Sequence, residues 1–437
     1  MSDLVLGLGV LLATAILAYL LHRIPWAAAL LSAIALVACF ILSARVSDEN
    51  MALYGLQLSV NTLSRAFLLI LFGAAAFLAL GAGHDQHIAY HGVLLATVAV
   101  LAGSILVQDI RLAVILLGVA TAVSMLMVQR GGRRAGLAGV YSLLPVPPGV
   151  IALLAAFWAA EVFALNPDQL KLPRISTMAA YVGLACLLGV SPLGTGLLSL
   201  ADVTSPGAIT GFLLTRDIGM IYLFLRILAL SSLSLEEANA LIWMGGLLLS
   251  AVSLLASVVR QPGRLVGLSG ITDLGVVLLC LAAGTAEGAT LAFFHLIVRS
   301  AAMALIEAGR GLVGHKKYTT IAKMGLLVGG LTAGGLPLTA GFVARRFIYN
   351  RLAGGEKIWL GMLLIASAVT CLAWLWIVFV GLEGEGQGEV PARSTMVMAG
   401  AVIALVGLIA LLSLQPKILL KPLAGAVETL TIAAFAL

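Results

Sequence analysis

Arg264-Leu-Val-Gly-Leu-Ser-Gly-Ile-Thr-Asp273-Leu-Gly275 opens the part of the chain that decides its fold. That part continues with His295-Leu-Ile-Val-Arg299-Ser-Ala-Ala-Met303-Ala-Leu-Ile-Glu307. It closes with Gly335-Leu-Pro337-Leu-Thr-Ala-Gly341-Phe-Val-Ala-Arg345-Arg346-Phe347. All three segments belong to apolar runs, and all three hold charged residues. A charge inside a membrane helix is costly, so these segments indicate a functional site with the rest of the chain as its scaffold.

Composition places the chain in a membrane. It has 437 residues, of which 62% are hydrophobic and 10% are charged, and its mean hydropathy is +1.13. Soluble domains do not have this balance, so we infer a polytopic membrane protein. Apolar runs of about 20 residues predict helices rather than the alternating ~10-residue strands of a barrel. The net charge of +6 gives no reason to expect nucleic acid as a partner.

The apolar runs predict an all-α fold with about fourteen transmembrane helices in a single membrane domain, residues 1–437. The expected spans are 3–22, 25–44, 61–82, 91–108, 109–128, 136–165, 175–200, 205–230, 237–258, 265–285, 287–312, 319–350, 357–382 and 395–414. A short apolar tail, 415–437, follows, and we expect it to lie along the membrane surface or to dock on a partner. The start of the chain lacks a basic segment and a cleavage site, so we interpret it as the first span rather than a signal peptide.

Basic residues in the loops predict the orientation. They are more numerous after odd-numbered spans, as at Arg23, Arg130, Arg133, Lys316 and Lys317. The positive-inside rule places these loops in the cytoplasm. We therefore expect an inner (cytoplasmic) membrane protein with both termini on the outer side.

Three prolines predict interrupted helices. Pro147 lies in mid-span in the sixth run, Pro206 in the Gly/Pro-rich connection before the eighth, and Pro337 in the twelfth. Proline removes a backbone donor and clashes with the preceding turn, and carbonyls freed inside a membrane need new partners. Proline kinks are common in membrane helices, but broken helices beside buried charges are typical of ion sites in transporters.

The sequence offers no motif for a cofactor, a metal or a catalytic residue. Its four cysteines, Cys39, Cys186, Cys280 and Cys371, lie in apolar spans and form no CxxC or Cys/His cluster. We interpret them as small core residues. Nucleophile elbows, phosphate loops, dinucleotide fingerprints and zinc spacings are missing too.

Several segments, in the same order along the chain, resemble the antiporter-like subunits of respiratory complex I. These subunits are related to those of Mrp-type cation/proton antiporters and membrane-bound hydrogenases. Residues 264–275 resemble R-L-L-A-Y-S-S-I-S-H-L-G, residues 294–299 resemble Y-H-L-L-N-H, and residues 335–345 resemble G-L-P-P-L-S-G-F-x-x-K/E. Residues 58–64 resemble F-S-V-D-G-L-S, and the stretch 192–206 resembles P-L-H-T-W-L-P-D-A…P-T-P.

The resemblance covers about the third to the twelfth spans. It implies two inverted five-helix repeats, at approximately 91–230 and 237–382, with discontinuous helices at the seventh and twelfth spans. It also implies a membrane-arm module that links quinone reduction to proton translocation, with quinone, flavin and iron–sulfur centres held only by partner subunits.

The chain departs from the family at its proton-carrying positions. The family's fifth-span glutamate falls at Gly118 or Val119, and its seventh-span lysine falls at Leu187. Family histidines become Asp273 and Arg299, a lysine becomes Met303, and the twelfth-span lysine or glutamate becomes Arg345. Arginine keeps its proton in proteins and is therefore a poor proton carrier, whereas burial can tune lysine and histidine toward neutral pH.

A different polar set remains as the candidate proton path or buried charge: Asp273, Arg299, His295, Arg216, Asp217, Arg345, Glu307 and Glu161. Asp273 and Arg299 can pair across the tenth and eleventh spans. His295 and Glu307, at i−4 and i+8 from Arg299, fall on roughly the same helix face.

Two interpretations of this set stay open. In one, the arginines are structural locks neutralised by aspartates; in the other, Asp273 and His295 handle protons. For Glu161 and Glu307, together with Asp109 and Arg111, we favour positions near the membrane interface, where charged groups are solvated.

The sequence therefore predicts an antiporter-like membrane-arm subunit of a complex I-type respiratory complex, associated with proton translocation coupled to quinone reduction. It would be a non-redox subunit with an altered proton path, whose partners are other membrane-arm subunits and the lipid bilayer. One alternative is a subunit of an Mrp-type cation/proton antiporter or a related ion-transport module, which would use Asp217 and Asp273. Another is a purely structural arm subunit, with a dry axis and every arginine locked to a carboxylate.

Overall fold

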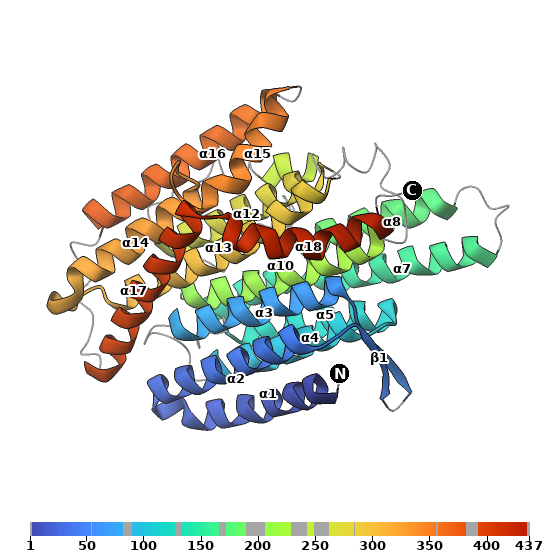
Figure 1. Cartoon of the computed structure of the whole chain (residues 1–437), viewed down its shortest axis with the longest axis horizontal. Helices are drawn as coiled ribbons and strands as arrows, with labels where there is room; N and C mark the ends of the chain where they lie inside the picture. The colour runs from blue at the N-terminus through green and yellow to red at the C-terminus, as the bar shows by residue number, and fades with distance from the viewer. Residues whose placement is uncertain are drawn as a thin grey trace.

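The computed structural model describes residues 2–53, 55–81, 90–127, 133–165, 172–188, 206–228, 243–248, 262–283, 285–354, 357–381 and 392–434. They form a helical bundle in which the N-terminal helices lie along one side and the later helices along the other (Figure 1). By length and composition, eight helical stretches of the described residues can cross a membrane. The chain is therefore a multi-pass membrane protein.

The helices follow the expected spans closely. The first part contains α1 (Ser2–Leu20), α2 (Pro25–Arg45), α3 (Thr62–Gly81), α4 (Tyr90–Leu106), α5 (Ile110–Ser124), α6 (Arg133–Leu143), α7 (Val146–Leu165), α8 (Leu172–Leu188) and α10 (Pro206–Leu228). The second part contains α12 (Pro262–Leu281), α13 (Ala286–Gly311), α14 (Thr319–Gly334), α15 (Gly341–Ala353), α16 (Lys357–Trp376), α17 (Ala392–Leu414) and α18 (Lys417–Ala434). Most of the expected span 237–258 lies outside the described residues, as does the connection from 189 to 205.

Local sequence signals set several helix starts. Pro25 occupies the first turn of α2, where its missing N–H costs nothing. The Asp109 side chain caps α5 by accepting a hydrogen bond from the Arg111 backbone N–H at 2.9 Å. Thr285 caps α13 in the same way, accepting from the Gly288 N–H at 3.1 Å. These caps satisfy backbone donors that a helix start leaves without intrahelical partners.

Helix α13 lies at the centre of the bundle. It packs against α3, α10, α12, α14, α15, α17 and α18. Its residues 288–309 are all buried except Ile297. A membrane helix that carries charged residues needs protein contacts around them, and α13 receives such contacts. The central position brings its polar residues into the interior rather than to lipid.

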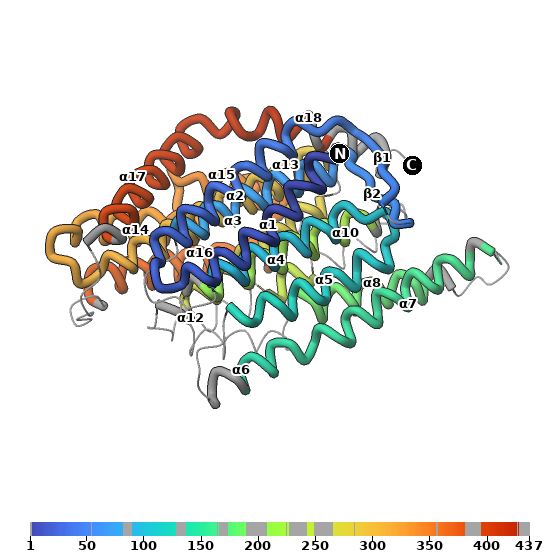
Figure 2. Tube along the Cα trace, turned by 90° about the horizontal axis from the view of Figure 1, so that it is seen from below, coloured from blue at the N-terminus to red at the C-terminus, as the bar shows by residue number. Residues whose placement is uncertain are grey.

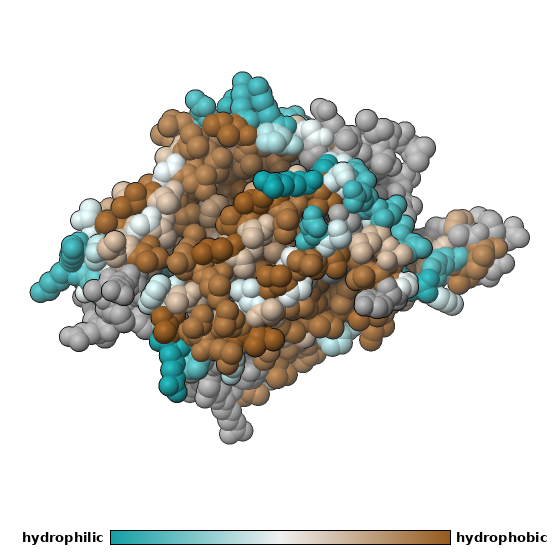
Figure 3. Space-filling view, turned by 60° about the horizontal axis from the view of Figure 1, so that its bottom comes forward, coloured by the Kyte–Doolittle hydropathy of each residue, from teal (hydrophilic) through white to brown (hydrophobic). Residues whose placement is uncertain are grey.

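The outer helices present an apolar surface. Leu6, Ile16 and Ile34 of α1 and α2 are 70%, 66% and 59% exposed. Hydrophobic residues cover most of the face seen in Figure 3, and hydrophilic ones form patches at its edges and across its upper middle. This pattern fits contact with lipid tails, which offer no hydrogen bonds.

Two of the expected spans are divided into pairs of helices. The sixth span is α6 followed by α7, with the boundary at residues 144–145, and Pro147 lies in the first turn of α7. The twelfth span is α14 followed by α15, and Pro337 lies between them. Pro206 is the first residue of α10. Proline is tolerated at a helix start because the N–H it lacks has no partner there in any case.

One short element departs from the all-α prediction. Strands β1 (Glu49–Leu53) and β2 (Leu56–Val60) form an antiparallel hairpin between α2 and α3, with Gly55 at φ +83° in its turn. The hairpin also pairs with the α4–α5 connection, where the Gln108 N–H donates to the Gln57 carbonyl at 2.9 Å. This second pairing is between segments far apart in sequence, so periodicity alone did not reveal the strands.

The C-terminal tail folds back on its own chain. Helix α18 packs against α3 and α13, and α17 and α18 together follow one edge of the bundle (Figure 2). The expectation that the tail lies on the membrane surface or on a partner therefore misses these contacts within the chain.

One arginine ties α10 to the end of α4. Arg226 donates through Nη1 to the Val107 carbonyl at 2.6 Å and through Nη2 to the Gln108 carbonyl. One turn earlier, the Tyr222 hydroxyl donates to the Ile105 carbonyl at 2.7 Å. A cation near a helix C-terminus also interacts favourably with the helix dipole.

Replacing Arg226 with glutamine is therefore expected to destabilise the protein by about 1.5–3 kcal/mol, because two charge-assisted hydrogen bonds to carbonyls are lost. The midpoint of thermal unfolding in mild detergent measures the effect. Arg174→Gln, at an exposed position of α8, is the control and is expected to leave the midpoint unchanged. Equal shifts in both variants would contradict the role of the Arg226 contacts.

Candidate functional site

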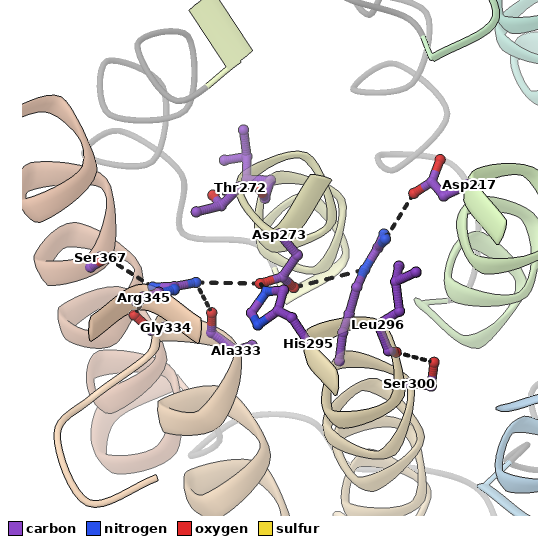
Figure 4. A network of polar contacts seen from close by, with 12 residues as sticks. Asp217, Thr272, Asp273, His295, Leu296, Ser300, Ala333, Gly334, Arg345 and Ser367 are labelled. Carbon is purple, nitrogen blue, oxygen red and sulfur yellow. Dashed lines mark hydrogen bonds and ion pairs between the residues drawn. The ribbon is translucent and has the colours of Figure 1, made fainter. Parts of the chain in front are cut away.

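Four helices bring a row of charged side chains together in the interior. Arg216 and Asp217 come from α10, Arg299 from α13, Asp273 from α12 and Arg345 from α15. Positive and negative side chains alternate along the row, and each neighbouring pair forms an ion pair. Figure 4 shows how Asp217, Asp273 and Arg345 lie along this row. We call these five residues the charge row.

The ion pairs of the charge row differ in length. Arg216 Nη2 lies 2.9 Å from Asp217 Oδ1, and Arg299 Nη1 lies 2.8 Å from Asp217 Oδ2. Arg345 Nη2 lies 3.3 Å from Asp273 Oδ1, and Arg299 Nε lies 3.8 Å from Asp273 Oδ2. Arg299 therefore bridges both aspartates, with the shorter contact to Asp217 rather than to the Asp273 side chain that the sequence suggested.

All five side chains are buried. Arg216 is 6% exposed and Arg299 3%, while Asp217, Asp273 and Arg345 are fully buried. A single charge in such a place carries a desolvation cost of several kcal/mol. Alternation of sign reduces this cost because every arginine contacts at least one carboxylate.

Asp273 contacts more nitrogen-bearing side chains than Asp217 does. In addition to its two arginines, it contacts His295, whose Nε2 lies 3.0 Å from Asp273 Oδ1. An ionised carboxylate only accepts hydrogen bonds, so Nε2 carries the proton in this contact. His295 Nδ1 is buried with no hydrogen-bond partner among the described residues. One carboxylate thus interacts with three nitrogen-bearing side chains.

Arg345 caps the broken helix α14. Its guanidinium donates to the carbonyls of Ala333, at 2.6 Å, and Gly334. It also donates to the Ser367 hydroxyl of α16 at 2.8 Å. The last carbonyls of a helix lack intrahelical donors and form the negative end of its dipole. Arg345 therefore supplies both hydrogen bonds and a positive charge to the carbonyls that the break in the helix leaves without intrahelical donors.

The local sequence explains the shape of the break. Gly335 takes φ +69°, the left-handed conformation that favours glycine after a helix. The N–H groups of Gly335 and Leu336 donate to the carbonyls of Thr332 and Leu331, both at 3.0 Å. These two bonds make a Schellman motif. A Cβ on Gly335 would collide with the Arg345 side chain, so glycine also makes room for the cap.

The space beside Arg299 is tightly filled. It is lined by Thr210, Leu213, Leu214, Val266, Gly270 and Met303, which leave no room for a water molecule. Gly270 matters here because a Cβ would lie 3.1 Å from Arg299 Nη2 and 2.8 Å from Leu213 Cδ1.

The two glutamates of the candidate set lie in different environments. Glu161, with a 53% exposed side chain, pairs with Arg111 at 2.5 Å. Glu307, by contrast, is only 5% exposed within α13, so its side chain is not solvated in the way the sequence suggested. In the described structure, Glu161 pairs with Arg111 and not with the charge row.

The positions that carry protons in the resembled family are filled by apolar packing. Leu187 is 1% exposed and packs against Gly149 of α7. Gly118 of α5 faces Val150 of α7, and a Cβ on Gly118 would lie 3.0 Å from Val150 Cγ2. Met303 is buried beside Arg299. No group at these three positions can exchange a proton.

Sequence reasoning missed Ser367 and the carbonyls of residues 333 and 334. A lone serine in the apolar α16 and two backbone oxygens carry no sequence signal of their own. No group of His, Cys, Asp and Glu is placed to hold a metal within the residues that the structure describes. The site can therefore hold and order charge, and of its members only the aspartates and the contacting His295 can change protonation state.

The fold and the charge row define a multi-pass membrane protein with ion pairs at its centre. A comparison with models of known protein families finds no match. Among characterised proteins, the chain is 27% identical over 212 residues to NADH-quinone oxidoreductase subunit N 2 of Solidesulfovibrio magneticus, covering 45% of each chain. It is 24% identical to NADH-quinone oxidoreductase subunit N of Geotalea uraniireducens, covering 50% of each chain. These matches span about half the length of the relatives.

Solved structures share the fold over nearly the whole chain. A chain of the Mrp complex from a Dietzia species superposes with TM-score 0.78 at 16% identity, covering 98% of this chain and 97% of that one. A chain of respiratory complex I from Thermus thermophilus gives TM-score 0.72 at 18% identity, with 95% and 98% covered. The chain therefore shares its fold with these subunits of membrane complexes, and about half of it is similar in sequence to NADH-quinone oxidoreductase subunits N. The resemblance predicted from the sequence is thus confirmed.

Proposed function

We propose that the chain is an antiporter-like membrane-arm subunit of a complex I-type respiratory complex, in which proton translocation is coupled to quinone reduction. The observation that carries this proposal is the similarity to subunits named NADH-quinone oxidoreductase subunit N in separate bacteria. The shared fold with a chain of Thermus thermophilus complex I supports it. The charge row lies in the interior of the helical bundle, and charged residues inside membrane segments are costly. Its presence therefore also supports a role within such an arm.

The finer features of the proposal follow from the sequence. We expect about fourteen spans in an inner (cytoplasmic) membrane, two inverted repeats near 91–230 and 237–382, and both termini on the outer side. Other membrane-arm subunits would be the partners. Quinone, flavin and iron–sulfur centres would belong to partner subunits, which makes this chain a non-redox part of the oxidoreductase.

Two alternatives compete with this assignment. An Mrp-type cation/proton antiporter subunit has the same fold, as the Dietzia chain illustrates. A purely structural arm subunit is favoured by one specific observation, namely that Arg216, Arg299 and Arg345 each contact a carboxylate, with no room for a water molecule in the described space beside Arg299.

Purification from its native membrane distinguishes these assignments. The tagged full-length chain is extracted in mild detergent, and the proteins that accompany it are identified by mass spectrometry. We expect quinone-binding subunits and subunits with iron–sulfur or flavin centres to co-purify. Recovery with only antiporter-like membrane subunits would overturn the respiratory assignment and support ion exchange. An untagged strain carried through the same steps is the control.

A further inference from the structure

We infer that the charge row is a fixed electrostatic barrier that prevents protons and other cations from crossing this subunit. The inference rests on the proposed membrane-arm role, because an arm that works on a proton gradient loses that gradient through any leak. It assigns Arg216, Arg299 and Arg345 to excluding cations rather than to carrying protons.

The arginines of the charge row cannot act as proton carriers. A guanidinium keeps its proton in proteins, so the three arginines remain positive whatever the pH on either side of the membrane. A relay needs groups that bind and release protons, and arginine does neither. The positions of Gly118, Leu187 and Met303 add no exchangeable proton either.

The three arginines are also held in place by several contacts each. Arg345 donates to two helix-end carbonyls, to Ser367 and to Asp273. Arg299 is held between Asp217 and Asp273. Arg216 donates to Asp217 through Nε and Nη2, at 3.1 and 2.9 Å, and its guanidinium stands 5.5 Å from the Phe212 ring centre. Together these contacts oppose the side-chain rotation by which an arginine could move its charge along the row.

The charge row as a whole carries a net positive charge. It holds three arginines and two aspartates, so one positive charge is left over. In a low-dielectric interior, such a charge repels an approaching cation much more strongly than it would in water. Arginine side chains exclude cations and protons from other membrane pores by the same effect.

His295 contacts the charge row and can take up a proton. Asp273 faces it at 3.0 Å, but Arg299 and Arg345 flank that same carboxylate. A second proton on His295 would raise the local excess of positive charge. The tight packing beside Arg299 also leaves no room for water on that side of the row. Charge and packing therefore act in the same direction.

Proton flux into proteoliposomes tests the barrier. The full-length chain is reconstituted into neutral phosphatidylcholine vesicles with an internal pH-sensitive dye, and a valinomycin-clamped potassium gradient drives proton entry. The wild-type protein is expected to match protein-free vesicles. Arg299→Gln removes the excess charge and is expected to raise proton entry by about tenfold, the factor equivalent to about 1.4 kcal/mol of barrier.

Two further variants separate charge from packing. The double variant Arg299→Gln with Asp273→Asn restores one excess positive charge with nearly the same side-chain volume, and is expected to be as tight as the wild type. Arg111→Gln removes an exposed arginine far from the row and is expected to have no effect. If Arg299→Gln does not yield folded protein, Arg216→Gln removes the same charge at the end of the row, with the same expectation.

Three results would overturn the inference. They are a wild-type protein that conducts above the protein-free baseline, a folded Arg299→Gln variant as tight as the wild type, and a double variant that leaks as much as the single one. The membrane-arm assignment is judged separately by co-purification. A leak with the expected partners present would reject the barrier alone, and a tight chain without those partners would reject the assignment alone.

Discussion

Replacing Asp273 with asparagine is expected to lower the free energy of unfolding by about 3–5 kcal/mol, the cost of leaving buried charges without their partner. Asp273 is fully buried and contacts Arg345 at 3.3 Å, His295 at 3.0 Å and Arg299 at 3.8 Å. Asparagine keeps the shape of the side chain and removes only its charge. The excess positive charge of the row would then double.

Thermal unfolding in detergent, followed with a dye that reacts with newly exposed thiols, measures this loss. The chain is suited to the method because Cys39, Cys280 and Cys371 are buried and free. Glu161→Gln is the matched control, since it neutralises a carboxylate whose ion pair is exposed to solvent. Exposed pairs contribute about 0–1 kcal/mol. Equal midpoints for the two variants would show that Asp273 does not hold the row together.

A double variant sharpens this prediction. Adding Arg299→Gln to Asp273→Asn removes one of the charges that the first change leaves without its partner, so part of the lost stability is expected to return. Residues in one network commonly show interaction energies of about 0.5–3 kcal/mol in such cycles. Strict additivity of the two single effects would contradict electrostatic coupling between the two residues.

Replacing Gly335 with alanine is the second change expected to have a large effect, a destabilisation of about 2–5 kcal/mol. The left-handed conformation costs a residue with a Cβ about 1–2 kcal/mol, and overpacking adds about 1–3 kcal/mol. The new methyl group would collide with the Arg345 side chain. Arg345 would have to leave the carbonyls of Ala333 and Gly334, and the end of α14 would lose its cap.

The same substitution at another glycine provides the control. Gly361 lies inside α16, and a Cβ there meets no atom within 4 Å. Gly361→Ala is expected to be neutral or to stabilise the helix by about 0.5–1 kcal/mol. Thermal midpoints of the two purified variants, compared with wild type, test the difference. A Gly335→Ala protein as stable as Gly361→Ala would mean that the break tolerates a side chain and that its geometry is not decisive.

Arginine at the break in α14 has consequences that lysine would not have. A lysine ammonium is a compact point charge on a flexible stem, whereas the planar guanidinium presents several donors in fixed directions. Arg345 uses them to reach two carbonyls, a hydroxyl and a carboxylate on three different helices. The residue thus both fixes the ends of the broken helix and places a permanent charge beside Asp273.

The sequence by itself determined the membrane class, the course of most helices and the two places where a span is divided. These features depend on local properties: the apolar runs, the prolines near 145–148 and 337, and the glycines at 334 and 335. The sequence also identified every member of the charge row, because an ionisable residue inside an apolar run is conspicuous wherever it packs.

Tertiary structure alone decided how those charges are connected. Arg299 lies nearer to Asp217 than to Asp273, Arg345 reaches the end of α14, and Ser367 joins from α16. Glu307 is buried and Glu161 is solvated, although each follows an apolar helical run. The hairpin at 49–60 and the docking of α18 on α13 were likewise invisible to periodicity. Hydropathy fixes which segments enter the membrane, but packing between helices fixes which faces meet, and a side chain's partners depend on that second choice.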